Sequence, residues 1–302
     1  MKKQKEVLGT LAVLGGNVIF GFSFLFSKVA LGIVEPSVLV AVRFTVAFAV
    51  LNLIVLIGKT IGKEKFSFSL KGKPKKQILM LALCQPVVYF IAESYGIKLT
   101  SSSFAGIIIA LIPIVGIVAD AVLMHSKIQG RQILCAVMSV VGVGLTTVGA
   151  KDLDSSVIGL ALLLVAVVAG SLFYVFSKSS GVYYNPLERT YVMFAVGSAV
   201  YIITALVQSA GAYTQAFAGL LNPTFWVCIA YLAIVSSVCA FLLLNFGSNH
   251  VSVSKATLMA NSTTVISIIA GVVVLGESFG LMQIIGAIVI IVSVTIGDIV
   301  KE

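Results

Sequence analysis

The chain has 302 residues, of which 59% are hydrophobic and only 10% are charged, and its mean hydropathy is +1.13. A soluble domain could not cover its surface with so few polar residues, so this composition excludes an ordinary soluble protein. The net charge of +9 is concentrated in clusters beside apolar stretches, which argues against nucleic acid as a partner.

Apolar stretches of the roughly 20 residues that a membrane-spanning helix requires follow one another along the chain. The stretch after the N-terminal lysines is too long for the apolar core of a signal peptide, so we expect it to remain as the first span. We therefore predict an all-α integral membrane protein with ten transmembrane helices, at about residues 7–27, 36–58, 77–97, 101–123, 131–150, 156–177, 187–208, 224–246, 251–275 and 280–299.

The positions of the lysines predict the orientation in the membrane. Lys2, Lys3 and Lys5 precede the first span, and seven lysines lie between residues 59 and 76. Such clusters mark cytoplasmic segments, so we expect the N-terminus and this loop inside the cell. Ten crossings return the C-terminus to the same side. The expected location is therefore the plasma membrane, with both termini cytoplasmic.

The two halves of the chain share an ordered series of residues. In both "LFSKVALGIVEPSVL" and "YVFSKSSGVYYNPLE" a lysine is followed eight residues later by proline, as Lys28 with Pro36 and Lys178 with Pro186. At an offset of 151 the series continues with Gly96 and Gly247, Ser101 and Ser252, Ser103 and Ser254, Ala105 and Ala256, Ala119 and Ala270, Gln132 and Gln283, and Ala136 and Ala287. This series predicts an internal duplication with units at 1–150 and 151–302.

Each predicted unit holds five spans, so the second unit enters the membrane from the opposite side. Lys28 is then expected near the outer end of span 1 and Lys178 near the inner end of span 6. Inverted repeats of this kind suit alternating access around a site near the midplane of the bilayer. The repeat by itself therefore favours a transporter.

Three stretches resemble the EamA-type members of the drug/metabolite transporter superfamily. They are "IFGFSFLFSKVALGIVEPSVLVAVRF", "GIKLTSSSFAGIIIALIPIV" and "NHVSVSKATLMANSTTVISIIAGVVVLGE". The resemblance extends over nearly the whole chain and implies ten spans in two five-span repeats around a central cavity. The chain departs from the family pattern at Ser126, where a glutamate is common, and at Thr264, where a proline is common, whereas Glu277 keeps the glutamate of the second repeat.

Polar side chains within the spans are candidates for function, because a charge in hydrocarbon costs at least about 2.5 to 3.5 kcal/mol. Gln85, Tyr89 and Glu93 are spaced by four residues in span 3 and therefore share one helical face. Glu93 could meet a cationic group of a substrate or carry a coupling proton. It could equally pair with a lysine near the helix end, such as Lys98.

Spans 1 and 6 carry further candidates at related positions. Asn17 and Lys28 share a face of span 1, and Tyr174 and Lys178 share a face of span 6. These residues could form two walls of one cavity. Alternatively, the two lysines could extend to the headgroups and fix the depth of their helices.

Three more candidates lie within the predicted spans. Arg43 could bind a substrate carboxylate, or form a structural ion pair with Glu93 or Asp120. Asp120 could carry a proton or lie at a helix end near the cytoplasmic headgroups. Asn261 could contact the substrate, within a hydroxyl-rich patch that could also serve helix packing.

Motifs for other chemistry are not found. Gly58-Lys59-Thr60 lacks the earlier glycine of a P-loop, since position 53 is leucine. His125 and His250 are far apart, and neither a His-Glu-x-x-His nor a Gly-x-Ser-x-Gly motif occurs. The four cysteines lie in apolar runs without a Cys-x-x-Cys pair. We therefore predict no enzyme, no metal site and no cofactor.

The most favoured function is a secondary active transporter that exports small metabolites such as amino acids. Both charge signs occur within the spans, which suits a zwitterion. One alternative is the proton-coupled export of lipophilic cationic drugs, and another is a passive channel or a non-transporting membrane scaffold. The expected partners are a small-molecule substrate, the lipid bilayer and, as a coupling ion, the proton.

Overall fold

The computed structural model describes residues 2–60, 70, 72–124, 130–148, 153–251, 256, 259–278 and 280–299, and these are almost entirely helical. The helices of the first half are α1 (Lys2–Leu31), α2 (Pro36–Thr60), α3 (Lys75–Ala82), η2 (Leu83–Val88), α4 (Tyr89–Leu99), α5 (Ser102–Ile109), α6 (Ile112–Met124) and α7 (Gly130–Val148). Those of the second half are α8 (Leu153–Ser180), α9 (Pro186–Gln208), α10 (Tyr213–Ala218), η3 (Gly219–Leu221), α11 (Pro223–Ile229), η4 (Ala230–Cys239), α12 (Ala240–Gly247), α14 (Asn261–Leu275) and α15 (Leu281–Ile299).

Among the described residues, seven helices are long and apolar enough to cross a membrane. They are Gln4–Leu31, Pro36–Gly58, Lys75–Leu99, Ser102–Leu123, Val157–Ser180, Pro186–Gln208 and Pro223–Gly247. The predicted spans 5, 9 and 10 correspond to shorter apolar helices, within α7, α14 and α15. The chain is therefore a multi-pass membrane protein.

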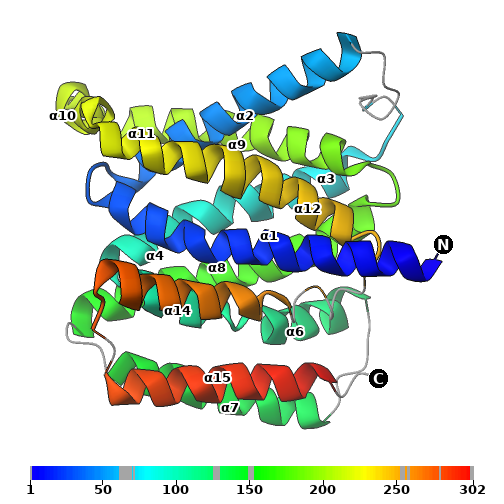
Figure 1. Ribbon diagram of the computed structural model, residues 1–302, viewed down its shortest axis with the longest axis vertical. Helices are drawn as coiled ribbons and strands as arrows, with labels where there is room; N and C mark the ends of the chain where they lie inside the picture. Colours follow the sequence, from blue (N-terminus) through cyan, green and yellow to red (C-terminus); the bar gives the residue numbers. More distant parts are fainter. Residues whose placement is uncertain are drawn as a thin grey trace.

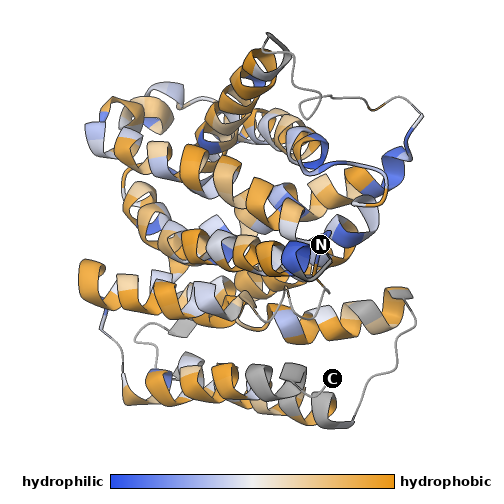
Figure 2. Ribbon diagram, turned by 45° about the vertical axis from the view of Figure 1, so that its right-hand side comes forward, coloured by the Kyte–Doolittle hydropathy of each residue, from blue (hydrophilic) through white to orange (hydrophobic). Residues whose placement is uncertain are grey.

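The bundle is built in layers, with α1 beginning and α15 ending at the same end (Figure 1). Its most extensive contacts join the two halves of the chain, since α2 packs on α9, α1 on α14, α4 on α8 and α7 on α15. Apolar residues dominate the helices, and the most hydrophilic segments lie near helix ends (Figure 2). Many large apolar side chains are exposed, as expected for helices that face lipid.

Proline and small polar residues explain where several helices begin. Proline occupies the first helical position of α2, α9 and α11, where its missing N–H costs no hydrogen bond. Asn185 accepts a hydrogen bond from the Glu188 N–H, and the Glu188 carboxylate accepts one from the Asn185 N–H, which together form a capping box. Ser101 caps α5 in the same manner by accepting from the Phe104 N–H.

Two of the long helices are interrupted by π-helical segments, η2 and η4. In η2 the backbone of Gln85 is extended, with φ −145° and ψ 118°. The Tyr201 hydroxyl of α9 lies 2.7 Å from the Pro86 carbonyl oxygen and 2.8 Å from that of Val87. A residue of the second half therefore adds hydrogen bonds to two carbonyls within the interruption of the first.

Replacing Tyr201 by Phe tests this support. The variant removes a buried donor that bonds the Pro86 and Val87 carbonyls, so we expect it to lower the free energy of unfolding by about 1 to 3 kcal/mol. Denaturation of the purified protein in detergent measures this change. Tyr213→Phe, on the exposed α10, serves as the control and should leave stability unchanged. Equal stability of Tyr201→Phe and the parent protein would contradict this role.

Helices α7 and α15 approach each other closely through glycine. A β-carbon on Gly142 would lie 2.6 Å from an Ile290 side-chain carbon and 2.9 Å from the Gly286 carbonyl oxygen. Nearby, the hydroxyls of Ser139 and Ser293 are 2.7 Å apart. Small residues and hydroxyl bonds of this kind hold membrane helices together.

Alanine substitutions on α7 provide a matched test of this contact. Gly142→Ala should lower the unfolding free energy by about 1 to 3 kcal/mol, because the close packing cannot accept the added methyl group. Gly144 lies two residues further along α7, and a β-carbon there would have no heavy atom within 4 Å. Gly144→Ala should therefore leave the unfolding free energy unchanged or raise it by up to about 1 kcal/mol. Unfolding in detergent measures both. A loss at Gly144 equal to that at Gly142 would rule out the packing explanation.

Candidate functional site

A buried group of polar side chains lies at the centre of the bundle, and we call it the central cluster. Each of its members is at most 6% exposed. The cluster draws on helices from both halves of the chain and comprises Asn17 of α1, Arg43 of α2, Gln85 of η2, Tyr89 and Glu93 of α4, Tyr174 of α8 and Thr263 of α14.

Hydrogen bonds tie three of these helices together. The Tyr174 hydroxyl donates to Asn17 Oδ1 at 3.2 Å, and the Thr263 hydroxyl donates to the Asn17 carbonyl oxygen at 2.8 Å. The Asn17 amide in turn donates to the Val13 carbonyl oxygen at 2.9 Å. The structure thus brings Asn17 and Tyr174, which are 157 positions apart, to one place.

A small cavity opens between these side chains. Only about 20 Å³ of it is open to the centre of a water molecule, which is room for roughly one water. Its walls carry amide and hydroxyl groups as well as aromatic rings. Its lining includes Asn17, Phe20, Gln85, Tyr89, Phe173, Tyr174 and Thr263.

Arg43 is 1% exposed and spans the contact between the two halves. Its guanidinium donates to the hydroxyls of Ser236 and Ser237 in η4, both at 3.0 Å. The guanidinium carbon also lies 4.3 Å from the centre of the Phe90 ring, a cation–π arrangement. Ser236 and Ser237 were not among the residues predicted from the sequence, because serine in an apolar span gives no signal of its partner.

Glu93 lies on the same face of α4 as Tyr89. The Tyr89 hydroxyl hydrogen-bonds the Glu93 carboxylate. The charge of Glu93 faces that of Arg43, but the two ion pairs found in the described part of the chain do not include them. Lys98 pairs instead with Glu35 at 2.5 Å. The pairing of Glu93 with Lys98 that the sequence left open is therefore not formed.

The two repeat-related lysines do not line the cavity. Lys28 donates to the carbonyl oxygens of Ile97 and Thr100, at 2.9 and 2.5 Å, at the C-terminal end of α4. Lys178 donates to the Val251 carbonyl oxygen at 2.9 Å. A cation is favourable beside the carbonyls that end a helix.

Glu277 occupies the N-terminal end of α5, close to Lys28. Its carboxylate accepts from the backbone N–H groups of Ser102 and Ser103, at 2.8 and 2.9 Å, and from both hydroxyls. A carboxylate is the expected partner for the positive end of a helix. Glu277, in the second half of the chain, therefore caps a helix of the first half.

A guanidinium that was not among the predicted site residues is buried near the start of α9. Arg189 is fully buried and donates to the carbonyls of Ser177 and Asn245. It also donates to the hydroxyls of Ser177 and Ser248 and to the Asn249 side chain. Pro186, three residues earlier, was the available signal that Arg189 lies one turn inside a helix.

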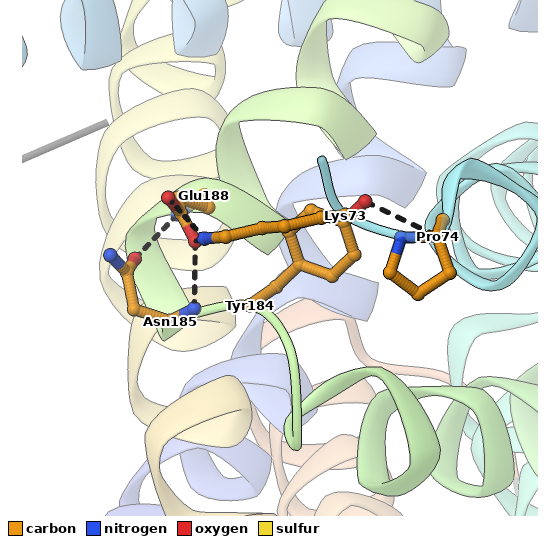
Figure 3. A network of polar contacts seen from close by, with 5 residues as sticks. All are labelled: Lys73, Pro74, Tyr184, Asn185 and Glu188. Carbon is orange, nitrogen blue, oxygen red and sulfur yellow. Dashed lines mark hydrogen bonds and ion pairs between the residues drawn. The ribbon is translucent and has the colours of Figure 1, made fainter. Parts of the chain in front are cut away.

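Next to Arg189, a polar network joins the loop after residue 70 to the start of α9 (Figure 3). Lys73 bonds both carboxylate oxygens of Glu188, at 2.8 and 2.6 Å, and lies over the Tyr184 ring. The Tyr184 hydroxyl donates to the Pro74 carbonyl oxygen at 3.1 Å. The network therefore connects segments more than 100 positions apart.

Two predicted site residues cannot be assigned contacts. Asp120 lies in α6 and Asn261 begins α14, but their side chains lie outside the described part of the chain. Among the residues that are described, no group of three histidine, cysteine, aspartate or glutamate side chains is arranged to hold a metal ion.

Seven apolar spans around a buried polar cluster define a multi-pass membrane protein of the transporter type. The EamA-like transporter family matches residues 7–148 and again residues 157–296, and the chain belongs to this family. The two matches together cover most of the chain.

Individual relatives agree with this assignment. The chain is 31% identical to the uncharacterized transporter YcxC of Bacillus subtilis, over 100% of this chain and 96% of the relative. It is 24% identical to an uncharacterized transporter of Archaeoglobus fulgidus, over 94% and 96% of the two chains. A solved crystal structure superposes with a TM-score of 0.64 over 97% of this chain and 96% of the other, at 17% identity, which shows a shared fold.

Proposed function

We propose that this protein is a secondary active transporter that exports small metabolites such as amino acids across the plasma membrane by alternating access. The observation that carries the proposal is the burial of Arg43 and Glu93, of opposite charge, between helices of both halves. Burying charge in a membrane protein is costly, and such residues usually serve a substrate or ion pathway. Charges of both signs suit the carboxylate and ammonium groups of a zwitterion.

The roles that we propose within the cluster follow from the contacts. Glu93 carries the coupling proton, and Arg43 balances its charge while holding η4 through Ser236 and Ser237. Asn17, Gln85, Tyr89 and Tyr174 contact the substrate, because they line the cavity. The cavity has room for about one water, so this conformation is a closed state that must open for a substrate to enter.

We further propose that the two halves are inverted copies of five spans each, with both termini cytoplasmic. The family matches the chain twice, which supports the duplication. The bonds from Lys28 to the Thr100 carbonyl and from Lys178 to the Val251 carbonyl also support it, because they join residues offset by 150 and 151 positions. Two such halves can exchange conformations and so open the cavity to each side in turn.

Counterflow in proteoliposomes tests the transport mechanism. Vesicles loaded with an unlabelled amino acid should accumulate the labelled form transiently, because a carrier that returns loaded moves faster than one that returns empty. A panel of amino acids identifies which ones exchange. A passive channel or a non-transporting scaffold would show no stimulation from the opposite side, and that result with every amino acid would refute the proposal.

The alternative, the export of lipophilic cations in exchange for protons, is favoured by the aromatic rings around the cluster. Phe20 lies edge-on to Phe241 and Phe90 is tilted against it, with ring centres 5.4 and 6.0 Å from that of Phe241. Aromatic rings attract organic cations. Counterflow of tetraphenylphosphonium, without counterflow of any amino acid, would favour this alternative.

A further inference from the structure

A second hollow lies away from the central cluster, where α2 begins and α9 ends beside α10, and we call it the α2–α10 pocket. About 420 Å³ of it is open to the centre of a water molecule, which is within the range of small-molecule sites. Its lining consists of Glu35, Ser37, Tyr95, Gln208, Ser209, Ala212, Gln215 and Ala216.

Two serine hydroxyls of the lining have no protein partner. Ser37 is 2% exposed and Ser209 is 6% exposed, and within the described residues neither hydroxyl makes a hydrogen bond. Neither oxygen is among the described buried atoms that are cut off from water, so both are free to bond a polar occupant of the hollow. The Tyr95 hydroxyl and the Gln208 amide add further polar groups, which are bonded to each other at 2.8 Å.

The start of α2 makes one side of the pocket favourable for an anion. Pro36 has no N–H, and at the start of α2 the Leu39 N–H donates to the Glu35 carbonyl oxygen. The N–H groups of Ser37 and Val38 therefore lie in the first turn, where a helix leaves them free. At the position 150 residues later, the Asn185–Glu188 capping box fills the corresponding end of α9. Val38, which stands where α9 has Glu188, cannot supply such a cap.

An opposite charge lies beside this anion-favouring end. The Glu35 side chain is 60% exposed and its partner, Lys98, is 35% exposed, so a ligand can reach both. An ammonium group could replace Lys98 at Glu35, while a carboxylate bonds Ser37 and the start of α2 and remains near Lys98. Among the lining residues only Tyr95 is aromatic. A pocket with a single aromatic ring is poorly suited to bind a lipophilic cation.

We propose that the α2–α10 pocket is a second binding site, for the ammonium and carboxylate groups of an α-amino acid, on the outer route to the central cluster. This inference rests on the proposed function, which supplies the substrate class and the orientation. Ser37 precedes Arg43 on α2 by six residues, about 9 Å along the helix, and Gln208 follows Tyr201 on α9 by about 10 Å. The pocket therefore lies roughly two helical turns from the central cluster, toward the start of α2 and the end of α9.

Cysteine protection on α10 tests the site. Cys84, Cys135, Cys228 and Cys239 are first replaced by alanine, and Ala216→Cys then places a thiol in the pocket lining. Ala218→Cys is the matched control, because Ala218 is exposed on the same helix but does not line the pocket. A membrane-impermeant maleimide is added to right-side-out vesicles, with L-serine or L-glutamine as the probe.

Either amino acid, at roughly ten times its dissociation constant, should slow labelling of Ala216→Cys about tenfold, because occupancy leaves about one site in ten open. Labelling of Ala218→Cys should not change. Ethylamine or acetate, each carrying one of the two charges, should protect far less. Absence of protection by both amino acids, equal protection at Ala218→Cys, or stronger protection by tetraphenylphosphonium would overturn the proposal.

Two substitutions assign the contacts. Glu35→Gln should raise about tenfold the amino acid concentration that halves labelling of Ala216→Cys. This is the effect of losing one charge-assisted hydrogen bond. Ser37→Ala preserves the Lys98–Glu35 pair and should also weaken protection, so a folding defect in one variant leaves the other to decide. Unchanged protection in a folded Ser37→Ala and a folded Glu35→Gln protein would contradict the assignment.

Counterflow of the same amino acids separates this proposal from the function on which it rests. Counterflow without protection would leave the transporter intact and refute the α2–α10 pocket. Protection without counterflow of any amino acid would support the pocket and refute amino acid transport.

Discussion

Glu93→Gln should abolish accumulation driven by a pH gradient, with a loss of at least about 100-fold, as expected when a group that transfers a proton is removed. Glutamine keeps the size and hydrogen-bonding capacity of the side chain but cannot release a proton. Counterflow at equal pH should persist, because exchange of bound substrate needs no net proton movement. Uptake of labelled amino acid into proteoliposomes, with and without a pH gradient, measures both activities.

Glu6→Gln is a suitable control for this variant. Glu6 is an exposed glutamate in the first turns of α1, far from the central cluster in the sequence and on the surface of the protein. The substitution should leave both activities unchanged. Full pH-driven uptake by Glu93→Gln would remove Glu93 from the coupling role, whereas loss of counterflow as well would indicate that Glu93 contacts the substrate.

Arg189→Met should destabilise the protein by about 2 to 6 kcal/mol, or about 1 to 3 kcal/mol for each of two buried carbonyls that lose this donor. The side chain is fully buried and bonds groups of α8, α12 and the turn after α12. Methionine fills similar space but leaves the Ser177 and Asn245 carbonyls without this donor. Thermal unfolding in detergent, together with the yield of monodisperse protein, measures the effect.

Arg189→Lys separates charge from geometry. Lysine keeps the positive charge but lacks the planar fork of donors that reaches several oxygens at once. It should therefore restore only part of the stability. Lys5→Met, at the exposed start of α1, is the control for removal of a cation and should have no effect. Wild-type stability of Arg189→Met would show that these contacts contribute little.

The sequence predicted the long spans because hydropathy over about 20 residues reports the lipid environment directly. Spans 2 and 7 begin at Pro36 and Pro186, within one residue of the prediction. The interruption at η2 was missed although Pro86 marks it, since proline in a helix interior removes a backbone bond. The interruption at η4 has no proline or glycine within it, so local sequence gave no indication of it.

The candidate site was predicted in part. Helical spacing predicted that Gln85, Tyr89 and Glu93 share one helical face, but the extended backbone of Gln85 interrupts the helix before Tyr89. Gln85 and Tyr89 line the cavity with Asn17 and Tyr174, whereas Glu93 is not among its lining residues. Spacing within one helix cannot identify partners on another. The carbonyls that Lys28 bonds, at Ile97 and Thr100, and the serines that Arg43 bonds therefore became known only from the packing of the helices.

Opposite orientation of the two halves is the claim on which the transport mechanism depends, and labelling at two related positions tests it most directly. Gly32→Cys follows α1 and Val182→Cys follows α8, both are exposed, and they are 150 residues apart. In cells and in inverted vesicles of a cysteine-free background, an impermeant reagent should label Gly32→Cys only from outside and Val182→Cys only from inside. Labelling of both positions from the same side would show two units in parallel orientation and contradict alternating access by inverted repeats.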